Sequence, residues 1–183
     1  MKKKIKNEIK IRGQIISISL ILENTLERVI FNTFKPKKYN TEIKELYLKK
    51  FIRPITFSKK IEIFNLLLKT EIYQKKIINL LESPTNLMIK KRNINSNKEL
   101  TNFLNKSLQD ILKTRNSVAH GYLAHGLNLT NLEKDILNIE KSSYIFNNND
   151  KVEILNVKDL KPFSEKTILT CYFISSIYFQ NEK

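Results

Sequence analysis

Glycine, proline and cysteine are scarce in this chain. Only three glycines and four prolines occur among its 183 residues. Because glycine and proline interrupt regular structure, their scarcity favours long helices over many short strands. Cys171 is the single cysteine, so no disulfide can form within the chain, and with only two histidines it offers no zinc-binding spacing. We therefore expect no metal or cofactor, and a cytoplasmic location as the simplest setting for a lone thiol.

Long apolar runs are missing as well. The first residues are basic, but Glu8, Lys10 and Arg12 follow where a signal peptide would be apolar. The apolar stretch 15–22 is far too short to span a membrane, and Glu23 ends it. We expect neither a secretory signal nor a membrane anchor.

Positive charge is what the chain has in excess. Hydrophobic residues make up 41% and charged residues 28%, an ordinary globular composition, but the net charge is +15. A basic surface attracts phosphates, which suits a nucleic acid as partner. An AT-rich genome would enrich lysine, isoleucine and asparagine regardless of function, so charge alone leaves both explanations open.

The spacing of apolar residues predicts a mainly all-α fold in a single domain over residues 1–183. One long helix is expected over 7–34. A second begins at Thr56 or Ser58, either of which could cap it, and has a kink or break near Thr70. The first of them carries a wide apolar stripe, so we expect it to be buried on more than one side.

The second half of the chain is predicted to be more varied. The basic stretch 90–98 is expected to be a loop, and an amphipathic helix after it leads to Arg115. A helical segment over 131–141 precedes two β-like runs that predict a small β-hairpin near 142–157. A last helix ends at Phe179. Its residues predicted to face inward are Ile168, Tyr172, Phe173 and Ile177.

Arg115 and His120 carry the clearest chemical signal. An arginine presents a fork of donors that fits a phosphate, and a neutral histidine can take or give a proton near neutral pH. On a helix, five positions separate the two by about a turn and a half, which we expect to leave them roughly on one side. RNA cleavage by its own 2′-hydroxyl needs a base, an acid and positive charge at the phosphate, and no metal. Asn116 adds a polar amide beside the arginine.

The run 115–121, Arg-Asn-Ser-Val-Ala-His-Gly, resembles the signature of the HEPN superfamily (higher eukaryotes and prokaryotes nucleotide-binding), which is Arg, usually a polar residue such as Asn, and His after four to six intervening positions. The pair Leu22-Glu23 in the first helix resembles a Leu-Glu pair common there. The segment 57–61, Phe-Ser-Lys-Lys-Ile, resembles a Phe-Ser-x-Lys/Arg-Ile run of HEPN proteins. The resemblance covers most of residues 8–125, and only the Arg/His motif in it is specific.

This resemblance implies a helical bundle and a metal-independent endoribonuclease. HEPN ribonucleases act in toxin–antitoxin, abortive-infection and CRISPR defence, and they usually dimerise so that two Arg/His motifs form one composite site. It therefore implies RNA as substrate, a homodimer, and a toxin or antiphage defence effector. On that basis Arg115 and His120 are catalytic, and Asn116 supports them.

Tyr122 extends the motif to Arg-x-x-x-x-His-x-Tyr. This resembles HEPN toxins whose nucleotidyltransferase antitoxin adenylylates the tyrosine, and implies a modification site at Tyr122 and a cognate antitoxin or sensor protein as partner. The chain departs from those compact toxins in its length and its predicted hairpin, so a packing role for Tyr122 stays open. His125, beside Gly126, is interpreted as a turn residue.

Glu23 lies on the apolar stripe of the first helix, so we expect it to be partly buried and paired with a cation. One candidate is Arg115, whose guanidinium the pair would orient, and the alternative is a lysine or arginine elsewhere. Arg12 shares this helix face and is expected to be solvated rather than to reach the site.

The basic clusters, such as Lys59-Lys60, are usually solvated faces, but one that lies beside the motif would bind RNA backbone. The cluster expected nearest the motif immediately precedes its helix. It consists of Lys90, Lys91 and Arg92. Two further functions stay open. One is a catalytically inactive HEPN-like module that binds a protein partner or a nucleotide. The other is a DNA-binding regulator, which rests on charge alone, because no helix-turn-helix signature is present.

Overall fold

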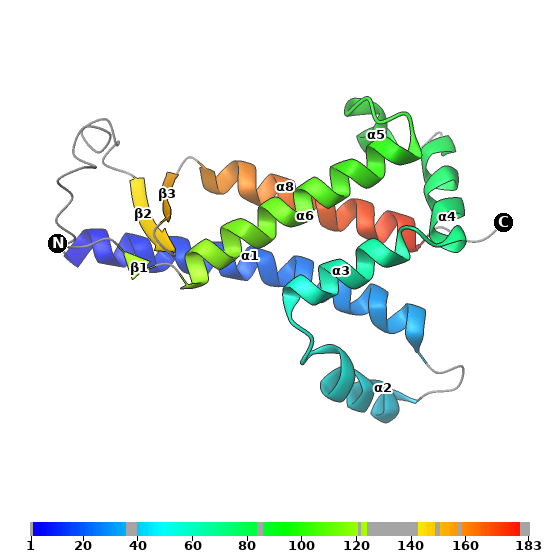
Figure 1. Cartoon of the computed structure of the whole chain (residues 1–183), viewed down its shortest axis with the longest axis horizontal. Coiled ribbons are helices and arrows are strands. Elements are labelled where there is room, and N and C mark those ends of the chain that lie inside the picture. The colour runs from blue at the N-terminus through cyan, green and yellow to red at the C-terminus, as the bar shows by residue number, and fades with distance from the viewer. Residues whose placement is uncertain are drawn as a thin grey trace.

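Helices make up most of the described structure, as the sequence predicts (Figure 1). The computed structural model describes residues 2–35, 40–83, 86–120, 122–123, 143–148, 151–156 and 159–179, and the side chains of 9–35, 40–83, 86–119 and 159–179. The helices are α1 (Lys2–Phe34), α2 (Thr41–Tyr47), α3 (Phe57–Leu67), α4 (Glu71–Glu82), α5 (Leu87–Lys91), α6 (Asn97–His120) and α8 (Leu160–Tyr178), with a π-helical turn η1 (Leu48–Ile52).

The three longest helices, α1, α6 and α8, contact one another pairwise and form the body of the molecule. In Figure 1, α1 and α8 run lengthwise and α6 crosses them. Their buried residues recur at helical spacing, so each helix turns one apolar face to the shared core. Fully buried positions on α1 and α6 include Leu22, Leu26, Leu100, Leu104, Leu108 and Ile111.

The predicted helix break near Thr70 is confirmed. Helix α3 begins after Thr56, whose hydroxyl accepts a hydrogen bond from the Lys59 amide at 3.3 Å. It ends at Leu67, and the Thr70 hydroxyl donates to the Leu67 carbonyl at 2.7 Å before α4 begins. The Thr56 and Thr70 hydroxyls thus form hydrogen bonds with backbone groups that would otherwise be unpaired at the ends of α3.

The inward face of the last helix is predicted only in part. Phe173 and Ile177 are buried as expected, but Ile168 is 59% and Tyr172 41% exposed. The prediction was wrong for these two because the buried stripe lies one position further along the helix. Its apolar members are Leu169, Phe173, Ile174 and Ile177, and Thr167 and Thr170 are buried beside them.

Three strands lie beside the end of α6. They are β1 (Tyr122–Leu123), β2 (Ser143–Asn148) and β3 (Lys151–Asn156), in the antiparallel order β1-β2-β3. Strands β2 and β3 pair through a register that places Ile145 opposite Ile154, and they fall within the range 142–157. Strand β2 also contacts α6. The helix expected over 131–141 lies outside the described residues.

Candidate functional site

Arg115 lies in the last third of α6, partly buried, with its guanidinium held by neighbours that carry no charge. Its Cζ lies 6.0 Å from the centre of the Phe57 ring, at the start of α3. Its Nη1 donates a 3.2 Å hydrogen bond to Oδ1 of Asn116. Among the residues whose side chains are described, no carboxylate forms an ion pair with Arg115. The ring and the amide therefore fix the group and leave its positive charge uncompensated by those residues, which suits an anion.

Glu23 does not pair with Arg115. Its carboxylate accepts from Nζ of Lys60 at 2.7 Å, and Glu27, one turn further along α1, accepts from the same nitrogen at 2.7 Å. The alternative expectation, that Glu23 pairs with a lysine or arginine other than Arg115, is thus confirmed. Lys60 is 1% exposed, so its ammonium needs both carboxylates in place of water. By holding α3 on α1, this cluster fixes Phe57, on which Arg115 rests.

The expectation that Arg12 is solvated was wrong. Its Nη1 donates to the backbone carbonyl of Val118 at 2.9 Å, two residues before the end of α6. The last four carbonyls of a helix have no partner within it, so a donor from another helix stabilises the end. Val118 itself packs against Ile11 and Ile15 in a small separate core. The first half of α1 therefore anchors the helix end that carries the motif.

His120 is the last residue of α6, and its side chain lies outside the described residues. Because the helix runs unbroken from Arg115 to His120, five steps of about 100° place the two backbone positions about 140° apart around its axis. The expectation that both lie roughly on one side was therefore wrong. Tyr122 follows in β1, paired with Asn147, and its side chain is likewise not described. His125 lies outside the described residues.

The basic cluster is not a loop throughout, and it does not lie beside the motif. Lys90 and Lys91 form the last turn of α5, and Arg92 is its C-cap. The guanidinium of Arg92 lies 5.6 Å from the ring centre of Phe103, near the start of α6. Phe103 precedes Arg115 by twelve helical residues, about 18 Å along the axis. The structure thus places the cluster near the opposite end of α6.

No group of three or more His, Cys, Asp or Glu side chains among the described residues could hold a metal ion. None of the helices in that part of the chain is long and apolar enough to cross a membrane. Burial raises the pKa of the Cys171 thiol, which makes it a poor nucleophile at neutral pH.

Sequence reasoning missed two side chains that organise this site. The expectation that Lys60 lies with Lys59 on a solvated face was wrong, since Lys60 is 1% exposed, and its spacing from Phe57 and Phe64 on the apolar face of α3 does signal burial. The contact of Arg12 with Val118 joins residues 106 positions apart, for which the sequence holds no comparable signal.

Comparisons with known proteins place the chain in no family. No family model matches it, and no curated protein or solved structure does so either.

Proposed function

We propose that this chain is a metal-independent endoribonuclease of the HEPN type, with a HEPN-like bundle and Arg115 and His120 as its catalytic residues. The observation that carries the proposal is the Arg115 guanidinium, held by Phe57 and Asn116 with no carboxylate among the described side chains to neutralise it. An arginine that serves only structure is usually paired with a carboxylate or with helix-end carbonyls. The net charge of +15 adds a general attraction for RNA.

The proposed reaction is attack by the 2′-hydroxyl of RNA on the adjacent phosphorus. The new bond joins the 2′-oxygen to phosphorus, and the bond from phosphorus to the 5′-oxygen breaks. One basic group takes the 2′-hydroxyl proton, and one acid protonates the leaving oxygen, leaving a 2′,3′-cyclic phosphate and a 5′-hydroxyl. His120 would serve one of these steps, while Arg115 stabilises the additional negative charge on the phosphoryl oxygens.

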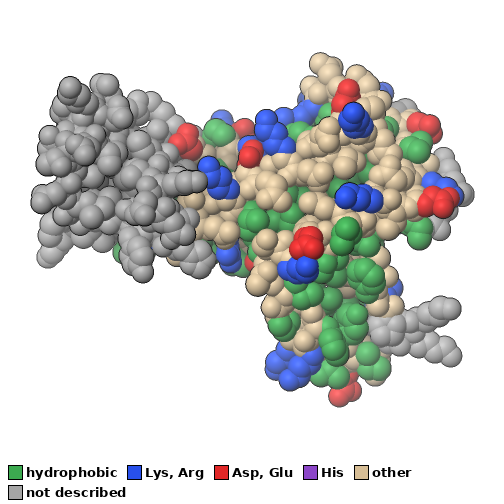
Figure 2. Space-filling view, viewed as in Figure 1, with side chains coloured by type: hydrophobic (Ala, Val, Ile, Leu, Met, Phe, Trp, Pro, Cys, Tyr) green, Lys and Arg blue, Asp and Glu red, His purple; other side chains and the backbone are tan. Residues whose placement is uncertain are grey.

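A homodimer is part of this proposal. Two backbone positions about 140° apart on one helix do not readily converge on one phosphate, so a second copy would complete the site. A surface suited to self-association lies on the arm formed by α2 and η1, where Ile43, Leu46 and Phe51 are 44%, 56% and 61% exposed. Figure 2 shows hydrophobic side chains gathered on this arm. Exposed apolar patches of this kind are typical of protein contacts.

A toxin or antiphage defence effector is the biological role that a ribonuclease of this type would fill. Its natural partner would be a cognate antitoxin, such as a nucleotidyltransferase that modifies Tyr122, or a sensor protein. These parts of the proposal rest on the motif in residues 115–122.

Cleavage of labelled RNA in the presence of EDTA tests the proposal. Purified wild type should yield fragments with 5′-hydroxyl and 2′,3′-cyclic phosphate ends. His120→Ala and Arg115→Ala should each lower the rate at least about 100-fold. His125→Ala and Arg53→Ala are matched controls, since they remove the other histidine and an exposed arginine that pairs with Glu45. Absence of cleavage by wild type, or equal cleavage by wild type and His120→Ala, would favour the binding module instead.

A further inference from the structure

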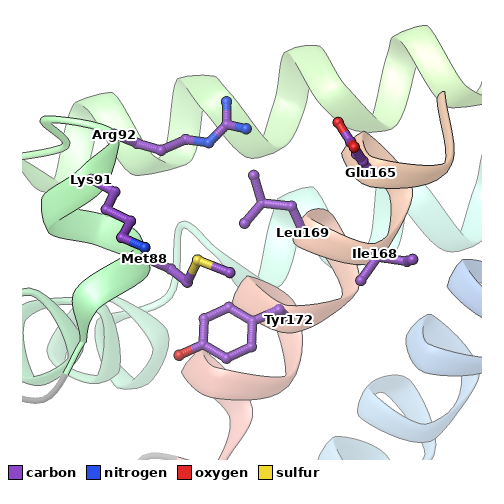
Figure 3. A pocket seen from close by; sticks show the side chains of 7 residues that line it. All are labelled: Met88, Lys91, Arg92, Glu165, Ile168, Leu169 and Tyr172. Carbon is purple, nitrogen blue, oxygen red and sulfur yellow. The ribbon is translucent and has the colours of Figure 1, made fainter. Parts of the chain in front are cut away.

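A cavity of about 680 Å³ lies between α5 and α8 (Figure 3). Met88, Lys91 and Arg92 line it from α5 and its C-cap, and Glu165 and Tyr172 line it from α8. Small-molecule sites have volumes of about 300–1,000 Å³, so this cavity has the size of a ligand site. It lies away from Arg115, toward the opposite end of α6.

One part of the cavity wall is apolar and accessible. Met88, Ile168 and Tyr172 are 45%, 59% and 41% exposed, although methionine and isoleucine are among the residues that folding most often buries. The ring of Tyr172 contacts the buried ring of Phe173, with 5.7 Å between the ring centres, so it is supported from the core side. An aromatic ring fixed in this way, with a methionine thioether on the same wall, offers a surface on which a planar group can stack.

Another part of the wall is basic. The Arg92 guanidinium is positioned by the Phe103 ring, and neither Arg92 nor Lys91 forms an ion pair with any described side chain. Among the described lining residues, the one carboxylate belongs to Glu165, whose Oε1 lies 3.9 Å from Nζ of Lys161. These described residues therefore carry a net positive charge. Paired lysine and arginine side chains of this kind bind phosphate oxygens.

We infer that this cavity binds a nucleotide, with the base against Tyr172 and Met88 and the phosphate at Lys91 and Arg92. A nucleotide joins a planar aromatic group to an anion, and the cavity presents a surface for each. The Glu165 carboxylate can accept a hydrogen bond from a base amino group or from a ribose hydroxyl. The bound nucleotide is either free or one unit of a single-stranded RNA, since both present the same chemistry.

The inference does not depend on cleavage, and its test uses His120→Ala protein so that RNA stays intact. Binding of the four nucleoside 5′-monophosphates is measured by calorimetry, and binding of a labelled 12-nucleotide single-stranded RNA by fluorescence anisotropy. Tyr172→Ala should weaken binding about tenfold, because base stacking on an aromatic ring is lost, whereas Tyr172→Phe should stay within twofold. Lys91→Ala combined with Arg92→Ala should weaken binding at least about tenfold.

Two matched comparisons make the result decisive. Lys49→Ala combined with Lys50→Ala removes the same charge from exposed positions on η1 and should leave monophosphate binding within twofold. If a monophosphate binds as tightly as the RNA, the ligand is a free nucleotide, and if only the RNA binds, with the same dependence on Tyr172, the cavity is an RNA subsite. The inference is overturned if neither probe binds. It is also overturned if the His120→Ala protein binds equally well with and without the Tyr172→Ala substitution. Absence of RNA cleavage would count against the proposed function, but it would not change the result of the nucleotide-binding test.

Discussion

Lys60 shows how one residue sets the geometry of the candidate site. Its ammonium is buried under α1 and is held by Glu23 and Glu27, each at 2.7 Å, while Phe57 on the same helix supports Arg115. The two carboxylates are themselves only 16% and 14% exposed. A buried cation without such partners would cost several kcal/mol, so the three residues act as one unit.

Replacing Lys60 with methionine tests this unit. The Lys60→Met protein keeps the aliphatic stem but leaves two partly buried carboxylates facing each other without a cation. We expect the free energy of unfolding to fall by about 3–5 kcal/mol, as measured by urea denaturation at pH 7. Adding Glu23→Gln and Glu27→Gln should recover much of the loss, since no uncompensated charge then remains.

The matched control is the neighbouring pair on the same helix. Lys59 and Glu62 are 2.8 Å apart, close to the 2.7 Å of the Lys60 pairs, but both side chains are 57% exposed. Lys59→Met should therefore change the free energy of unfolding by less than about 1 kcal/mol. Equal effects of Lys59→Met and Lys60→Met would show that burial does not govern the contribution of Lys60.

At the level of elements, α5 is a short helix that depends on its two ends. Asn86 caps its start, with Oδ1 accepting from the Ile89 amide at 3.2 Å. At its end, the amide of Ile94 bonds to the carbonyl of Ile89, and that of Asn93 to the carbonyl of Lys90. Asn93 adopts the left-handed conformation, with φ of 52°. This is a Schellman motif, and it fixes the position of Arg92 at the cavity.

Substitutions at Asn93 should reveal the cost of this backbone conformation. Asn93→Ala should lower the free energy of unfolding by about 1 kcal/mol, because a Cβ without a compensating polar group disfavours positive φ. Asn93→Gly should be neutral or stabilising by up to about 1 kcal/mol. Thermal unfolding monitored by circular dichroism measures both. Asn102→Ala, at an exposed position within α6, is the control and should not destabilise, because alanine favours a helix. Destabilisation by Asn93→Gly as large as by Asn93→Ala would contradict the role of φ.

The same elements show what the sequence can and cannot predict. The mainly helical fold, the long first helix and the break near Thr70 follow from apolar spacing and capping residues, which act locally. Helix α5 has five residues and one buried side chain, Ile89, so it lacks the periodicity on which such predictions depend. On α8, Ile168 and Tyr172 were wrongly predicted to face the core. Which side of this helix is buried depends on its packing against α1 and α6, which the sequence of α8 alone does not determine.

For the whole molecule, the sequence predicts which residue types the candidate site holds, but not which residues the fold brings into contact with them. The residue types at Arg115 and His120 indicate phosphate binding and proton transfer wherever they lie. The partner of Glu23 depends on which cation the fold brings close, and the sequence offers 33 lysines and arginines. The link from Arg12 to Val118 likewise exists only once α1 and α6 pack together.

At the scale of the assembled molecule, two inactive variants should complement each other if the site is shared between two copies. In a heterodimer of Arg115→Ala and His120→Ala chains, the composite site holds one native Arg115 and one native His120, contributed by different copies. Random pairing makes half of the dimers heterodimers, so refolding the two together should restore at most about half of wild-type cleavage. Mixing Arg115→Ala with the double variant Arg115→Ala/His120→Ala offers no complete site and should restore nothing. The contrary outcome is a first mixture as inactive as this control although native mass spectrometry shows heterodimers. Each chain would then use its own Arg115 and His120. The 140° between their helix positions would have to be bridged within one protomer.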